Sequence, residues 1–160
     1  MSTLPPTFAG PQASVPDAPS PAPGLLIVDR RPAEYAALVA ELGADLRVET
    51  ATTGHLAVVQ LRFATGGDAG PLPDLVLIDL DLPGIRGLDL LRLIRHTPEL
   101  RHLQTVMMAA ESDPELRFTC SQEGATACLE RPRDPAASQR LARVPRRLVL
   151  RPRGAAMASA

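Results

Sequence analysis

The chain has 160 residues, enough for one domain of ordinary size and short tails. Its formal net charge of −1 gives no support to a nucleic-acid-binding protein, and no apolar run approaches the ~18 residues of a membrane span. Cys120 and Cys128 are too few and wrongly spaced for a zinc cluster, so we interpret them as small apolar residues. We therefore expect a soluble, cytoplasmic protein that binds neither nucleic acid nor membranes.

The two ends of the chain differ in composition from its middle. Residues 1–23 are rich in Pro, Ala and Ser and have no helical or strand periodicity. We interpret them as a disordered leader and residues 151–160 as a disordered tail. A single folded domain over residues 24–150 remains.

Two apolar runs that each end on an aspartate indicate the central strands. Residues 25–28 (LLIV) precede Asp29, and residues 75–78 (LVLI) precede Asp79. Short runs that are apolar throughout are typical of strands buried on both faces of a parallel sheet. Ligands and chemistry gather at the carboxyl ends of such strands. A strand-end aspartate alone is more often a turn or cap residue, so its meaning depends on its neighbours.

Helical and strand patterns alternate along the rest of the chain. We predict three further strands, over residues 46–50, 105–110 and 125–129. We predict helices over residues 32–42, 54–63, 88–94, 114–122 and 136–150. Leu56, Val59 and Phe63 lie on one face of the second helix, and Pro145 is expected to break the last helix. This alternation predicts a doubly wound parallel α/β sheet.

The motifs LLIVDRRP, PDLVLIDLDLPGIRG, TVMMAA and LERP, in this order and spacing, resemble the receiver domain of bacterial two-component response regulators. The long loop before Pro73 and the run LRHLQTVMMAAESDPE are most similar to single-domain regulators that partner phytochrome-type kinases. The resemblance implies a flavodoxin-like, five-stranded parallel sheet of order 2-1-3-4-5, with the site between the first and third strands. It also implies a sensor histidine kinase or another signalling protein as partner.

The resemblance assigns roles to three aspartates. Asp79 occupies the phosphoacceptor position, where a carboxylate takes a phosphoryl group from a kinase histidine. The family holds Mg²⁺ with two acids after the first strand, the acceptor, and a backbone carbonyl two residues beyond it. Here Asp29 fills the first acidic position, and the carbonyl of Asp81 fills the last.

Four other positions depart from the family pattern. Arg30 replaces the second acidic metal ligand. The hydroxyl residue of the fourth strand falls on Ala109 or Ala110, neither of which has a hydroxyl. Arg131 replaces the lysine, and a guanidinium does not substitute for an ammonium at a tight site. Cys128 stands at the aromatic switch position.

Three functional hypotheses follow. We prefer a pseudo-receiver that acts by protein–protein interaction, with weak or no Mg²⁺ binding and little phosphorylation, because Arg30 removes metal assistance. The alternative is a working response regulator phosphorylated at Asp79. An unrelated enzyme on the same fold has no Ser/His/Asp or Cys/His arrangement to support it, so we expect no enzyme. A purely structural ion-pair network around the acids is the simplest competing interpretation.

Four structural expectations complete the prediction. The guanidinium of Arg30 should reach Asp29, Asp79 or both. The Arg131–Pro132 peptide bond should be cis, as the resemblance implies. The protein should be a monomer or weak dimer, because Pro145 interrupts the last helix. From Glu130 onward there are eight arginines against two acidic residues, which indicates either a solvated face or a docking surface for an acidic partner.

Overall fold

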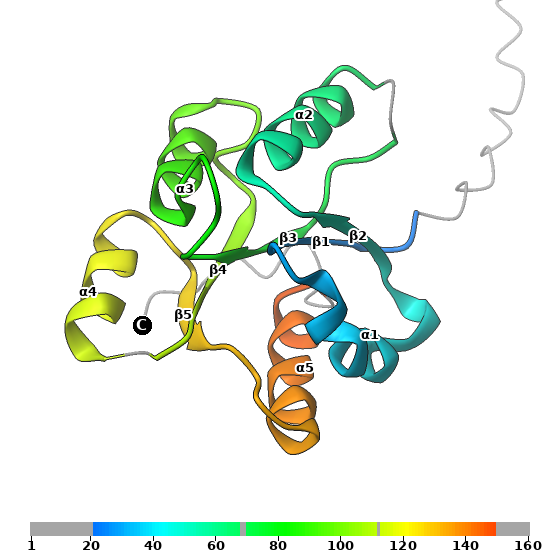
Figure 1. The fold of residues 1–160 in the computed structure, drawn as a ribbon. Helices are drawn as coiled ribbons and strands as arrows, with labels where there is room; N and C mark the ends of the chain where they lie inside the picture. Colours follow the sequence, from blue (N-terminus) through cyan, green and yellow to red (C-terminus); the bar gives the residue numbers. More distant parts are fainter. Residues whose placement is uncertain (1–20, 68–69, 112, 150–160) are drawn as a thin grey trace, which may run out of the picture.

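A computed structural model describes residues 21–67, 70–111 and 113–149. Five parallel strands form one sheet of order β2-β1-β3-β4-β5, as predicted (Figure 1). The strands are β1 (Gly24–Val28), β2 (Arg47–Ala51), β3 (Leu75–Asp79), β4 (Gln104–Ala109) and β5 (Ala127–Glu130). The predicted leader, except residues 21–23, and the predicted tail lie outside the described residues.

Five α-helices alternate with the strands and cover both faces of the sheet (Figure 1). They are α1 (Ala36–Leu42), α2 (Gly54–Thr65), α3 (Gly87–His96), α4 (Pro114–Gln122) and α5 (Pro135–Val149). The 3₁₀ turns η1 (Pro32–Tyr35) and η2 (Gly43–Asp45) flank α1. None of the described helices combines the length and apolar character needed to cross a bilayer.

Side-chain alternation along the central strands divides the core into two layers. Residues of β1 and β3 point alternately to opposite faces because the strand period is two. One layer packs against α2, α3 and α4, and its strand members are Leu26, Val28, Val76 and Ile78. The other layer packs against α1 and α5, and its strand members are Leu25, Ile27, Leu75 and Leu77. Burial on both faces explains why these two runs are apolar throughout.

The apolar face predicted on α2 does not enter the core. Leu56, Val59 and Phe63 are 41%, 46% and 55% exposed. Ala57 and Leu61 provide the buried contacts of this helix instead. Helical spacing shows which residues share a face, but tertiary packing decides which face is covered.

Two predictions about prolines were wrong. The helix α5 continues through Pro145, which is buried on its inner face. An interior proline costs about 3 kcal/mol of helix stability, but burial of Leu141 and Ala142 in the core offsets this cost. The Arg131–Pro132 bond is trans, since the described residues contain no cis peptide.

Candidate functional site at the carboxyl edge of the sheet

Two buried aspartates meet at the carboxyl edge of the sheet. Asp79 is the last residue of β3, and Asp29 directly follows β1. The two strands are paired in register, with Val28 opposite Ile78, so both acids lie at the same end of the sheet. Asp29 is 0% exposed and Asp79 is 1% exposed. Two carboxylates at such a place require a nearby cation or a proton.

The guanidinium of Arg131 supplies that cation. Its Nη2 atom lies 2.6 Å from Oδ1 of Asp79 and 3.4 Å from Oδ2 of Asp29. Arg131 follows β5, and its backbone N–H donates to the carbonyl of Ala109 at the end of β4 (2.8 Å). That bond continues the strand ladder and holds the base of the side chain at the sheet edge. Only 12% of the Arg131 side chain is exposed, so the arginine is part of the buried cluster.

Arg30 does not take the predicted position. It is exposed, and it forms no ion pair with another described residue. Successive side chains of an extended chain point to opposite sides. Because Asp29 turns into the sheet edge, its neighbour Arg30 turns away from it. The prediction that Arg30 neutralises the acids was therefore wrong, and Arg131 has that position.

Tyr35 completes the cluster, and the sequence analysis missed this role. Its hydroxyl donates to Oδ2 of Asp29 (3.1 Å), and the backbone N–H of Arg31 donates to Oδ1 (2.8 Å). Tyr35 is 1% exposed at the end of η1. Burial raises the pKa of the Tyr35 phenol, and the charge of Asp29 raises it further. The predicted helical spacing had identified Tyr35 as a core residue, but nothing in that pattern indicated a polar partner.

The Asp79 carboxylate is poorly solvated. Burial raises its pKa above 3.8; the backbone N–H of Asp81, at 3.2 Å, lowers it, and the charge of Asp29 raises it. The pKa of Arg131 is lowered by burial, but the charges of Asp29 and Asp79 reverse that effect and raise it. Within the described residues, Oδ2 of Asp79 and Nε and Nη2 of Arg131 have no hydrogen-bond partner. The Arg131–Asp79 contact is thus a close ion pair without hydrogen-bond alignment.

The remaining predicted site residues surround this cluster. Ala109 is 3% exposed at the end of β4, and Ala110 follows it on the surface. Asp81 is exposed and contributes its backbone N–H to Asp79. Cys128 is half-buried on β5 and is a free thiol, as is the buried Cys120. No side-chain hydroxyl at Ala109 or Ala110 faces Asp79, because neither residue has one.

The residues at this edge do not fit a divalent cation. Arg131 places a positive charge against both Asp29 and Asp79, where a metal would need their oxygens. The second acidic position holds the exposed Arg30. Among the described residues, no group of three His, Cys, Asp or Glu side chains is arranged to hold a metal ion. Charge neutralisation by Arg131 leaves little electrostatic demand for a second cation.

The family is decided by comparison with known proteins. Residues 25–142 match the model of the response regulator receiver domain, which is more than half of the chain. The chain belongs to this family. Receiver domains act in two-component signalling, interact with histidine kinases and other signalling proteins, and generally bind Mg²⁺.

Relatives of this receiver domain are found in bacteria and plants. Chemotaxis protein CheY-3 of Vibrio cholerae is 37% identical over 59 residues, which are 37% of this chain and 45% of CheY-3. Response regulator PleD of Caulobacter vibrioides is 31% identical over 111 residues, 69% of this chain but 23% of PleD. Two-component response regulator ORR3 of Oryza sativa is 27% identical over 124 residues, 77% of this chain and 90% of ORR3. The match thus covers less than half of CheY-3 and of PleD.

Solved receiver structures have the same fold. The phosphorylated cyanobacterial phytochrome response regulator RcpA has a TM-score of 0.70 at 19% identity, over 80% of this chain and 94% of RcpA. The Mn²⁺-bound form of response regulator Rcp1 has a TM-score of 0.67 at 19% identity, over 78% of this chain and 91% of Rcp1. A putative response regulator from Chloroflexus aurantiacus has a TM-score of 0.65 at 29% identity, over 80% and 98% of the chains. Similarity to RcpA agrees with the predicted resemblance to phytochrome-associated regulators; at 19% identity, it concerns the fold.

Proposed function

We propose that this receiver domain is a pseudo-receiver, which transmits signals by protein–protein interaction and is phosphorylated weakly or not at all. One observation carries the proposal: the guanidinium of Arg131 lies 2.6 Å from Asp79, whose side chain is 0% exposed. A carboxylate nucleophile must be exposed to its phosphodonor. Here the nucleophile is buried and already paired with a cation.

The residues that would stabilise a transferring phosphoryl group are also altered. Arg30 stands where the family has an acidic metal ligand, and Ala109 has no hydroxyl to donate. Arg131 is held by Asp29 and Asp79 together, so its charge is committed within the protein. Phosphoryl transfer depends on positioning and charge stabilisation, and each lost donor can cost about 10²–10³ in rate.

We propose that the partner is a sensor histidine kinase or another signalling protein, that the domain itself is not an enzyme, and that it works in the cytoplasm without binding nucleic acid. A monomer or weak dimer remains a prediction. The broken last helix no longer supports it, because α5 is continuous.

The second candidate is a phosphoacceptor with altered motifs. One observation favours it: Oδ2 of Asp79 has no hydrogen-bond partner among the described residues, so one oxygen of the acceptor is not committed. Movement of Arg131 would expose this oxygen. The two candidates therefore differ in whether Arg131 releases Asp79.

A phosphorylation assay separates them. The parent protein and the triple variant Arg30→Asp, Ala109→Thr, Arg131→Lys are incubated with Mg²⁺ and a small-molecule phosphodonor, and intact mass is followed with time. The triple variant restores the second acid, the hydroxyl and the lysine, so we expect it to be modified at least about 10²-fold faster than the parent. The same variant with Asp79→Asn is the control and should remain unmodified. Mg²⁺-dependent modification of the parent at Asp79 would establish the working phosphoacceptor instead.

A further inference from the structure

The outer face of α5 carries a row of arginines. Arg140, Arg143 and Arg147 are exposed and spaced three and four residues apart, which places them on one side of the helix. The opposite side packs into the core through Leu141 and Ala142. We call Arg140, Arg143 and Arg147 the α5 arginine row.

The α5 arginine row has no internal counter-charge. The sequence of α5 contains no acidic residue. None of the three arginines forms an ion pair with another residue in the described ranges. Like charges three and four residues apart destabilise a helix by about 0.2–0.5 kcal/mol per pair. The helix dipole favours cations only in the last turn, which accounts for Arg147 but not for Arg140 or Arg143.

Arginines elsewhere in the domain are used differently. Arg92 pairs with Asp89 and Glu123, and Arg131 pairs with Asp29 and Asp79. Arg95 donates to backbone carbonyls and to Thr105. Against these internal uses, three adjacent unpaired guanidinium groups form a surface suited to an external anionic group.

A groove beside the α5 arginine row narrows the choice of anionic partner. It has a volume of about 570 Å³ and lies between the end of β5 and α5, with Arg140 on one wall. The apolar side chains of Leu129, Leu141 and Val144 line it, and so do the acidic Glu111, Glu130 and Asp134. The acids would repel a polyanion such as nucleic acid, whereas the apolar lining suits a protein segment with an apolar side.

We propose that the α5 arginine row docks an acidic amphipathic helix of a partner protein. Carboxylates spaced three and four residues apart on that helix face the three guanidinium groups, and apolar side chains beside them enter the groove. Arg140 and Arg147 are seven residues apart, about 10 Å along α5, so two turns of a partner helix match the row. The inference deepens the proposed function by naming the chemistry of the partner, and its test is independent of phosphorylation.

Binding of a synthetic probe tests this docking surface. The probe is an amphipathic helical peptide with glutamates at three- and four-residue spacing on one face and leucines on the adjoining face. It is titrated into the isotope-labelled full chain, and amide chemical shifts are followed by NMR. We expect the shifts to change along α5 and in the groove. In the variant Arg140→Gln, Arg143→Gln, Arg147→Gln, we expect the affinity to fall about tenfold or more, since three exposed ion pairs are lost.

A matched variant controls for net charge. Arg62, Arg101 and Arg117 are exposed and their side chains form no ion pair with other described residues. The variant Arg62→Gln, Arg101→Gln, Arg117→Gln removes the same three charges, and we expect its affinity to stay within about twofold of the parent's because no ion pair with the probe is lost.

Three outcomes overturn the proposal: no binding of the peptide, equal weakening in both triple variants, or tighter binding of a DNA duplex or phosphatidylserine vesicles than of the peptide at α5. If the parent is phosphorylated at Asp79 but the peptide still binds α5, only the proposed function fails. If Asp79 stays unmodified and the peptide does not bind, only the docking surface fails.

Discussion

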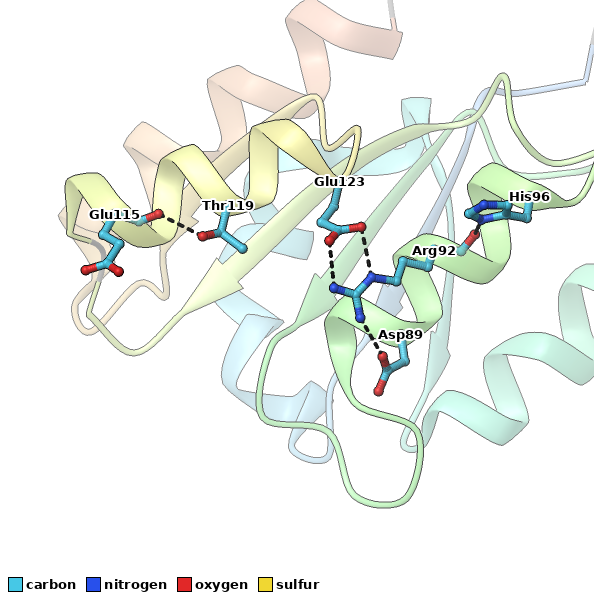
Figure 2. Close-up of polar contacts among 6 residues, drawn as sticks. All are labelled: Asp89, Arg92, His96, Glu115, Thr119 and Glu123. Atoms are coloured by element: carbon cyan, nitrogen blue, oxygen red, sulfur yellow. Dashed lines mark hydrogen bonds and ion pairs between the residues drawn. The ribbon is translucent and has the colours of Figure 1, made fainter.

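Arg131 and Arg92 each contact two carboxylates, but one does so inside the protein and the other at its surface. Arg131 bridges Asp29 and Asp79 with 12% of its side chain exposed. Arg92 on α3 bridges Asp89 and Glu123 with 46% of its side chain exposed (Figure 2). The two arginines therefore perform the same task in different solvents.

The geometry of the two pairs is the reverse of their expected importance. Arg92 makes two aligned hydrogen bonds to Glu123, of 2.9 Å and 2.6 Å, which join α3 to the end of α4 (Figure 2). These bonds lower the pKa of Glu123 and raise that of Arg92. Arg131 has no aligned hydrogen bond at Nη2. Yet water and salt can replace Arg92 at the surface, and nothing can replace Arg131 in the interior.

Replacing Arg131 should have the largest effect. The variant Arg131→Met keeps much of the side-chain volume but leaves Asp29 and Asp79 buried without a cation. Removing one partner of a buried ion pair costs about 3–5 kcal/mol, and we expect a loss of this size in the free energy of unfolding at neutral pH. Urea denaturation measures it, with Arg131→Lys as the control that keeps the charge. A variant as stable as the parent would show that the acids are neutralised in another way.

The effect of Asp79→Asn should be smaller and depend on pH. Burial raises the pKa of Asp79 above 3.8, so the folded state binds this proton more tightly than the unfolded state. Ionisation of Asp79 therefore lowers the stability of the parent as pH rises from about 3.8 through the raised pKa, and this cost is absent at lower pH. Asparagine does not titrate, so the stability of Asp79→Asn relative to the parent should increase with pH across this window.

Urea denaturation at a series of pH values measures this difference. Asp113→Asn is a poor control because Asp113 caps α4, whereas the exposed Asp45 has no such role. We therefore use Asp45→Asn, whose stability relative to the parent should change less with pH. A relative stability of Asp79→Asn that falls with rising pH would mean that Arg131 holds the pKa of Asp79 below its ordinary value.

Replacing Arg92 should have the smallest effect. Arg92→Ala removes a well-aligned but solvated contact, so we expect a small loss of thermal stability at low salt. The loss should disappear at about 1 M salt, where the screening length falls to about 3 Å. Thermal melts at two salt concentrations measure this, and the charge exchange of Arg92→Glu with Glu123→Arg is the control for the pair. A large, salt-independent loss would show that Arg92 is as important as Arg131.

Sequence alone determined the architecture, because apolar runs and helical spacing depend on local periodicity. The runs before Asp29 and Asp79 predicted the two central strands, and the alternation of elements predicted the sheet order through the family resemblance. The joint position of the two acids followed from the same reasoning, since the carboxyl ends of parallel strands share one edge.

Tertiary structure decided which side chains complete the site and which surfaces remain free. Arg30 is adjacent to Asp29 in sequence but turns away, whereas Arg131 arrives from the end of β5 and reaches both acids. Packing also carried α5 through Pro145 and left Leu56, Val59 and Phe63 of α2 exposed. Propensity and spacing describe a segment by itself, but the direction of a long side chain and the covering of a face depend on distant segments that only the folded chain brings together.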